Sequence, residues 1–235
     1  MDPAQLSNAV TERVTIPMLG GIEDWKEQLK FMLQALSRQP GYLRTRWGPW
    51  SEDQQKLELI TGWADAEAHD AWKKSADHAE AMARLAPVLD GEPSGCLLRF
   101  RPYAPQAVIN SPIVETLIFE DCGEPDDRMR DVVERAARMP GCNGVASGSS
   151  LRRPNSGSCG GGDGGGVDTG VDGITGTGTG TGAGTGTDKR TFVAAIGWTG
   201  LEASRRADKT AYTGGMKPES HHVDFNFPVK GFGGL

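Results

Sequence analysis

Two short motifs recur in this chain, and their spacing restricts the possible folds more than any other feature. The segment Gln39-Pro40-Gly41-Tyr42 recurs 100 positions later as Met139-Pro140-Gly141-Cys142. The segment ITGWADAEA at 60–68 recurs 135 positions later as AIGWTGLEA at 195–203. Long-range self-similarity of this kind indicates repeated copies of one structural unit. We therefore expect two similar units in tandem.

The two spacings differ by 35 positions, and one segment, about 155–189, accounts for the difference. It consists mainly of glycine and threonine, with almost no apolar side chains. Glycine carries a large backbone entropy, so such a segment is predicted to be a disordered loop. It does not fit a phosphate-binding GxGxxG loop, which needs a strand before it and a helix directly after. We place it inside the second unit, between its two middle strands.

Each repeat predicts the element order β-α-β-β-α-β. Apolar residues alternate where strands are expected and recur at helical spacing where helices are expected. In the first repeat we expect strands at 12–19, 42–47, 56–63 and 96–103, and helices capped by Asp24 and Asp65 that run to about 39 and 85. In the second we expect strands at 113–120, 143–151, 190–198 and 222–229, and helices at 126–139 and 201–212. The predicted units are 10–103 and 113–235, joined by a proline-rich linker at 104–112.

This element order is the ferredoxin-like arrangement. A single unit leaves one face of its sheet uncovered, and that face must be buried against something. Two units that pack sheet against sheet cover each other. The predicted fold class is therefore α+β, with two tandem ferredoxin-like units forming an intramolecular dimeric α/β barrel. A fused pair can close its own barrel, so both a monomer and a homodimer remain open.

Residues Glu58–Leu85 carry a family resemblance. A strand ends there in Gly-Trp, and a helix follows as DAEAHDAWKKSADH. This pattern resembles the antibiotic biosynthesis monooxygenase (ABM) family and its stress-responsive and polyketide-cyclase relatives, in which tandem fungal proteins recur. The resemblance implies a cofactor-free tailoring enzyme, either a monooxygenase or a cyclase, that acts on a hydrophobic, aromatic, polyketide-like small molecule and needs neither metal nor flavin. The alternative is a non-catalytic small-molecule-binding or stress-response protein.

His78 is the leading catalytic candidate. Trp72, Ser75 and His78 fall close to one face of the expected helix. In the cyclase relatives the matching histidine acts as an acid-base residue, a role that suits a side chain whose pKa lies near neutrality. The second repeat has Thr213 at the equivalent position. The competing interpretation is a solvent-facing or capping histidine.

One aromatic-basic cluster lies in and just after the expected strand 42–47. The resemblance implies that its members could form the wall of a substrate pocket: Tyr42, Arg44, Arg46 and Trp47, with Tyr103 from another strand. The two-residue period of a strand predicts that Tyr42, Arg44 and Arg46 share one face. The alternative places the cluster on an outward face, with Trp47 and Trp50 at the junction between the units. We expect Trp63, Trp72 and Trp198 in the core.

The other histidines do not predict a metal site. His69 lies nine positions before His78, which is not the spacing that places two ligands on one helix face. His69 lies next to Asp70 and is expected to be exposed. His221 and His222 open the last strand and should point to opposite faces, as an accident of strand entry rather than as cavity-lining residues.

Charge and composition restrict the possible partners and location. The net charge is −6, without a lysine-arginine cluster, so nucleic acid is not an expected partner. No apolar run approaches the roughly 20 residues that span a membrane, and the N-terminal segment is polar rather than signal-like. The four cysteines are widely spaced and form no CxxC pair. We therefore expect a reduced, cytoplasmic protein.

Overall fold

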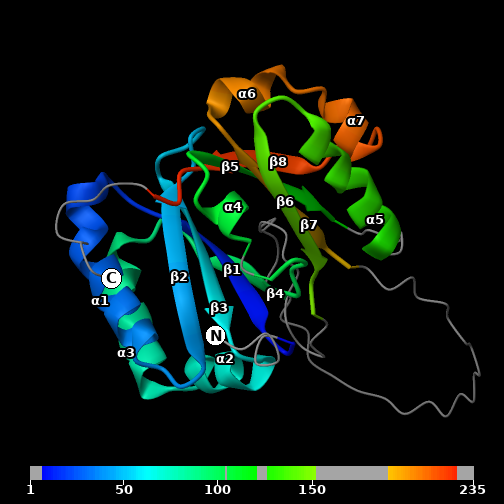
Figure 1. Cartoon of the computed structure of the whole chain (residues 1–235). Coiled ribbons are helices and arrows are strands. Elements are labelled where there is room, and N and C mark those ends of the chain that lie inside the picture. The colour runs from blue at the N-terminus through cyan, green and yellow to red at the C-terminus, as the bar shows by residue number, and fades with distance from the viewer. Residues whose placement is uncertain (1–6, 104, 121–125, 152–189, 227–235) are drawn as a thin grey trace, which may run out of the picture.

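The computed structural model describes residues 7–103, 105–120, 126–151 and 190–226. They form two four-stranded antiparallel sheets with helices on their outer faces (Figure 1). The strand orders are β2-β3-β1-β4 and β6-β7-β5-β8, so the second sheet repeats the first. This confirms the prediction of two tandem ferredoxin-like units.

The first unit contains β1 (Val10–Pro17), α1 (Ile22–Ser37), β2 (Tyr42–Pro49), β3 (Lys56–Trp63), α2 (Ala66–Lys73), α3 (Ala76–Leu85), a short 3-10 helix (Ala86–Val88) and β4 (Ser94–Leu98). Asp65 caps α2 as expected, since its side chain accepts a hydrogen bond from the backbone of Ala68. The single helix expected after it is divided, because Ser75 caps a new helix, α3. Asp24 is not a cap residue. It lies in the first turn of α1 and accepts a hydrogen bond from the backbone of Gly21, the residue before the helix.

The second unit contains α4 (Gln106–Ile109), β5 (Ile113–Phe119), α5 (Asp126–Val133), a 3-10 helix (Glu134–Arg138), β6 (Cys142–Ser149), β7 (Phe192–Trp198), α6 (Leu201–Arg206), α7 (Lys209–Thr213) and β8 (Glu219–Val223). The helix expected at 201–212 is divided because Asp208 caps α7. β6 and β7 pair directly as an antiparallel hairpin. The predicted glycine-threonine insert lies between them, at residues outside the described part of the chain. No helix among the described residues is long and apolar enough to cross a membrane.

The repeat extends to the pairing of individual residues. Val10 pairs with Trp63 in the first sheet, and Ile113 pairs with Trp198 in the second. β2 carries a bulge just after Tyr42, and β6 carries the equivalent bulge just after Cys142. The motifs that revealed the repeat therefore mark the same structural positions in both units.

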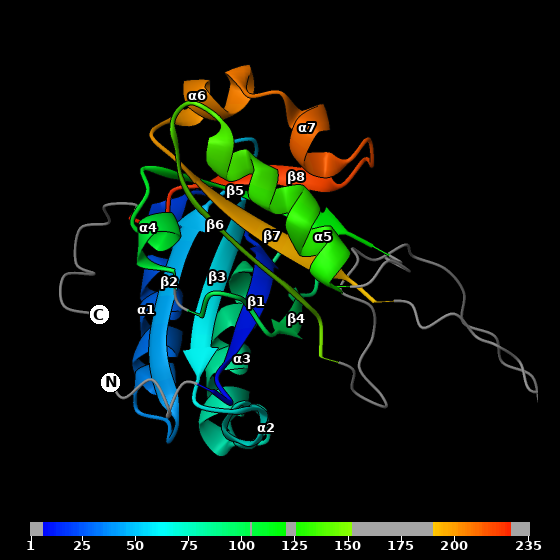
Figure 2. The ribbon, with the colours of Figure 1, turned by 45° about the vertical axis from the view of Figure 1, so that its right-hand side comes forward.

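The two sheets join at two seams, which close the strands into a barrel (Figure 2). At one seam, which we call the β4–β6 seam, backbone bridges connect Leu98 with Ser150 and Arg101 with Ser147. At the other, the β2–β8 seam, Trp50 bridges to Val223. This closure confirms the prediction of an intramolecular dimeric α/β barrel.

A glycine lies at each seam. A Cβ atom on Gly48 would lie 2.1 Å from the carbonyl oxygen of Asp224, and one on Gly148 would lie 2.2 Å from the carbonyl oxygen of Arg99. Real Cβ atoms do not approach other atoms this closely. Each seam therefore brings the backbone of one unit against the backbone of the other at a point where no side chain fits.

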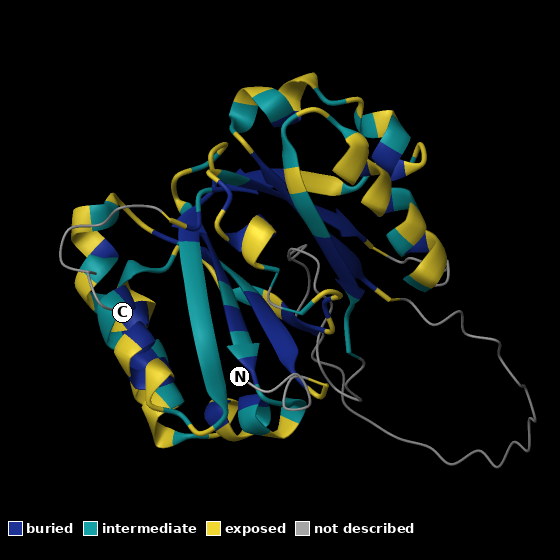
Figure 3. Ribbon diagram, viewed as in Figure 1, coloured by how far each residue is buried: buried dark blue, intermediate teal, exposed yellow. Residues whose placement is uncertain are grey.

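Buried side chains line the strands and the inner faces of the helices (Figure 3). One cluster lies between the first sheet and its helices and includes Trp63 and Trp72. A second lies between the sheets, and a third, around Trp198, lies between the second sheet and its helices. The expectation that these three tryptophans belong to the core is confirmed.

Candidate functional site

A buried polar cluster lies between β1 and α2 in the first unit. Glu12 of β1 is 8% exposed, and its Oε1 lies 3.0 Å from Nε2 of His69 and 3.7 Å from Nζ of Lys73. The indole nitrogen of Trp63 donates to its other oxygen at 3.4 Å. Burial alone would raise the pKa of Glu12, but the hydrogen bond and charge of His69, helped by Lys73, lower it below its ordinary value. The cluster therefore holds an ionised carboxylate beneath α2.

His69 is buried, which corrects the expectation that it is exposed. It is 5% exposed, and its ring packs edge-on against Trp63 at a centroid distance of 5.9 Å. Its position on α2, three residues before Trp72, puts both side chains on the face that packs on the sheet. The carboxylate of Glu12 supplies the buried partner that the imidazole needs. The polar neighbours of His69 in the sequence are what suggested exposure.

His78 lies in the first turn of α3, half-buried beside Trp72. The two rings meet edge-on with centroids 5.0 Å apart. Burial and the charge of Lys73 lower the pKa of His78 below its ordinary value, against a smaller opposite effect of Glu12. His78 is therefore a neutral imidazole at pH 7. The backbone N–H of His78 donates to the hydroxyl of Ser75 at 3.0 Å. Ser75, and not the side chain of His78, therefore caps α3.

The predicted pocket residues from β2 do not share one face. The bulge after Tyr42 adds a residue to the strand, so Tyr42 turns toward the helices and packs against Trp63, at a centroid distance of 6.3 Å. Trp47 packs on the same side against Trp25, at 6.1 Å. The prediction that Tyr42 lies with Arg44 and Arg46 is therefore wrong, because an extra residue reverses the alternation of side chains.

Arg44 belongs to a different neighbourhood, next to α4. Both its terminal nitrogens lie 3.0 Å from the side-chain oxygen of Gln106, in the amide orientation that satisfies both groups. Burial and the nearby charge of Arg46 lower the pKa of Arg44. Burial raises the pKa of Tyr103 to about 12, although Arg44 opposes the change. The six predicted site residues therefore do not form one pocket. Tyr42, Trp47 and His78 pack against different tryptophans on the helix side of the first sheet. Arg44 lies next to α4, with Arg46 and Tyr103 close enough to affect its pKa.

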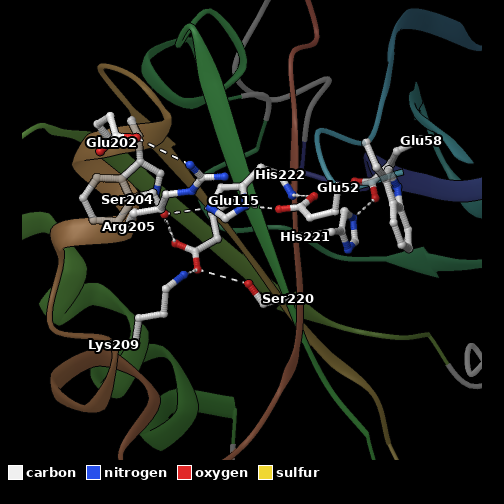
Figure 4. A network of polar contacts seen from close by, with 12 residues as sticks. Glu52, Glu58, Glu115, Glu202, Ser204, Arg205, Lys209, Ser220, His221 and His222 are labelled. Carbon is white, nitrogen blue, oxygen red and sulfur yellow. Dashed lines mark hydrogen bonds and ion pairs between the residues drawn. The ribbon is translucent and has the colours of Figure 1, made fainter. Parts of the chain in front are cut away.

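A second polar network, which we call the seam network, crosses the β2–β8 seam (Figure 4). Nδ1 of His222 lies 2.5 Å from Glu52, a residue of the first unit, and Nε2 lies 2.8 Å from Oγ of Ser204. Ser204 Oγ lies 3.0 Å from Glu115. The order serine, histidine, glutamate has the connectivity of a hydrolytic triad. Ser204 is fully buried, however, so a substrate carbonyl cannot reach it.

Glu115 is the counterpart of Glu12 and accepts hydrogen bonds from five side chains. The donors are Trp198, Ser204, Tyr212, Ser220 and Lys209. Burial and the charge of Glu115 together raise the pKa of Tyr212 well above its ordinary value. In the first unit Glu12 pairs with a histidine. In the second unit its counterpart Glu115 instead accepts hydrogen bonds from the side chains that surround it.

His221 lies between the sheets, on the opposite side of β8 from His222. Its Nε2 is 2.5 Å from Glu58, which also pairs with Arg13 at 2.8 Å, and its ring stacks on Trp50 at 3.8 Å. Burial would raise the pKa of Glu58, but Arg13 and His221 lower it to about 2. The prediction of opposite faces is confirmed. The interpretation of these histidines as an accident of strand entry is wrong, because both are buried and each binds a glutamate of the first unit.

The described residues contain no group of three or more histidine, cysteine, aspartate or glutamate side chains that could hold a metal ion. Cys142 is a half-buried free thiol.

Several solved structures share this fold. A candidate monooxygenase from Lactobacillus acidophilus NCFM covers 92% of this chain and 93% of its own, with a TM-score of 0.51 and 11% identity. An anthrone oxidase-like protein covers 93% and 92%, with a TM-score of 0.59 and 8% identity. A candidate monooxygenase from Fusobacterium nucleatum covers 92% and 91%, with a TM-score of 0.52 and 10% identity. At these identities the likeness shows the fold alone.

No curated protein matches the chain. A family model does match it, over residues 19–84, and its description is antibiotic biosynthesis monooxygenase. The matched segment begins three residues before α1, ends within α3, and includes both His69 and His78. Residues 19–84 thus carry the resemblance to the antibiotic biosynthesis monooxygenase family, inside a fold of two ferredoxin-like units that close one barrel.

Proposed function

We propose that the first unit is an ABM-type, cofactor-free oxygenase that acts on an aromatic small molecule. The observation that carries the proposal is the position of His78. It lies in the segment that matches the family, half-buried against Trp72, and its lowered pKa keeps it neutral near pH 7. A neutral imidazole beside an aromatic surface can accept a proton from a bound aromatic substrate.

The reaction that fits this base is oxidation of an activated methylene group between aromatic rings. His78 takes one proton from the methylene carbon, and the resulting carbanion reduces dioxygen. One oxygen atom becomes a carbonyl oxygen on that carbon, and the other leaves as water. The charge of Glu12 acts to raise the pKa of His78, so it stabilises the imidazolium that forms when the proton is transferred.

The test is oxygen consumption with an anthrone as the probe substrate. We expect His78→Ala to lower the turnover about 10²- to 10⁴-fold, the usual contribution of a positioned base. Lys74→Ala changes an exposed neighbour outside the cluster and serves as the control. Since the base must be deprotonated, turnover by the unaltered protein should fall only below the ordinary histidine pKa of 6.5. Equal turnover by the two variants would exclude His78 as the base.

The second candidate function is small-molecule binding without catalysis. The packing around His78 counts against a catalytic cavity there, because Trp63 and Trp72 are buried in a core cluster of the first unit. This alternative predicts that an anthrone binds with no oxygen consumption, and that His78→Ala weakens binding only slightly. Measuring binding and oxygen consumption on the same preparations separates the two functions.

A further inference from the structure

The β4–β6 seam carries a cleft lined by residues of both units, and His78 is not among them. The cleft encloses about 450 Å³ between the seam and the start of α5. Sites for small ligands usually have volumes of about 300–1,000 Å³, so a small molecule fits. Four arginines and two aspartates line it, together with residues 149–151: Arg99, Arg101, Arg130, Arg190, Asp126 and Asp127.

The charges in the cleft do not balance. Asp127 pairs with Arg130 at 3.3 Å, and Asp126 accepts a hydrogen bond from Ser149 at 2.6 Å and lies 3.9 Å from Arg190. Arg99 and Arg101 have no carboxylate partner among the described residues. Counted over its described lining residues, the cleft thus holds more positive than negative groups, in a chain whose net charge is −6. A concave site of one sign concentrates its field and attracts ions of the opposite sign.

The backbone fixes the two arginines that lack a carboxylate partner. The N–H of Arg99 donates to the carbonyl of Ser149 at 3.2 Å, and the N–H of Arg101 donates to the carbonyl of Ser147 at 2.7 Å. Phe100, between them, is buried in the cluster between the sheets. Because side chains alternate along an extended strand, Arg99 and Arg101 both point outward, into the cleft below α5.

Closure of the barrel does not require this cleft. At the β2–β8 seam, side-chain contacts between the units take its place: Trp50 stacks on His221, and Glu52 binds His222. The residue in the position of Arg99 is Asp224, which has the same close approach to a seam glycine. The two seams share a backbone geometry but differ in side chains, and in the described part of the chain four arginines gather at the β4–β6 seam.

We infer that this cleft binds a small organic oxyanion, either a carboxylate or a phosphate monoester. The planar guanidinium groups of Arg99 and Arg101 match the paired oxygens of such groups. The hydroxyls of Ser149 and Ser150 lie in the same cleft, and Leu151 offers an apolar wall for the organic part of the ligand.

Calorimetric titration of the full chain with benzoate and with phenyl phosphate, at constant ionic strength, tests this site. We expect saturable binding of at least one probe, weakened 10-fold or more by the double variant Arg99→Gln/Arg101→Gln. The matched control is Arg205→Gln/Arg206→Gln, which removes the same charge from two exposed arginines of α6. It should bind as the unaltered protein does. The probe that binds more tightly identifies the preferred oxyanion.

Two results would overturn the inference: no saturable binding of either probe, or equal weakening in both double variants, which would indicate an effect of net charge alone. Circular dichroism and thermal unfolding of each variant establish that the fold is intact. The His78→Ala variant should bind both probes as the unaltered protein does. The oxyanion site is therefore tested independently of the proposed oxygenase function.

Discussion

Glu12 and Glu115 occupy the same position in the two sheets, but their surroundings differ. Glu12 binds the imidazole of His69, whereas Glu115 is enclosed by hydroxyls, an indole and the ammonium of Lys209. The oxygens of Glu115 accept hydrogen bonds from five side chains, which fix the carboxylate in one position. In the first unit the carboxylate contacts a histidine directly, whereas in the second it reaches His222 only through Ser204.

The contacts of His222 connect the two units through single side chains. Its Nδ1 lies 2.5 Å from Glu52 of the first unit, and its Nε2 lies 2.8 Å from Oγ of Ser204. Ser204 in turn donates to Glu115 at 3.0 Å. One imidazole therefore joins a glutamate of the first unit to the buried polar cluster of the second.

At the scale of single elements, the sequence predicts the strands well and their faces less well. Residues 56–63 were expected as a strand and form β3, because apolar residues alternate along them. The bulge after Tyr42 has no local signature, and it moves Tyr42 away from Arg44. Ser75 is a cap residue in the middle of a helical pattern, and that signal was available in the sequence.

The seam glycines give the clearest test at this scale. Gly148→Val should destabilise the protein by about 3 kcal/mol or more, because its side chain would meet the carbonyl of Arg99 and the seam has no room to move aside. Gly200→Ala is the matched control, since nothing lies within 4 Å of a Cβ atom there and the backbone is extended. Urea denaturation measures both. If the two variants were equally stable, the seam would not be the close contact described.

At the scale of the whole molecule, the two units depend on contacts that no local pattern reveals. His221 meets Glu58 across 163 positions of the chain, and His222 meets Glu52 across 170. The repeat in the sequence predicts the barrel, but no sequence pattern identifies the partners of these two histidines. The partners come from the other unit, so only the packing of the sheets brings them together.

Glu58 should make the association of the units sensitive to acid. Its pKa falls from 4.5 in the unfolded chain to about 2 in the fold, so its ionised form stabilises the fold above pH 4.5, and this contribution is lost as the pH falls toward 2. Its size is about 3 kcal/mol, from about 1.4 kcal/mol for each unit of pKa. Glu58→Gln should lose stability relative to the unaltered protein at pH 6, and the difference should shrink toward pH 2. A difference independent of pH would exclude this linkage.

The position of β8 has a consequence for synthesis on the ribosome. β8 follows every other described strand in the sequence, yet it supplies His221 to the buried charges of β1 and β3. While the chain emerges, Arg13 and Glu58 can pair early, but the ring of Trp50 and the β2–β8 seam stay uncovered until residues 219–223 arrive. The first unit is therefore synthesised first, but its packing is completed only after β8 has been synthesised. Until then its inner face is a surface that a nascent-chain chaperone can bind.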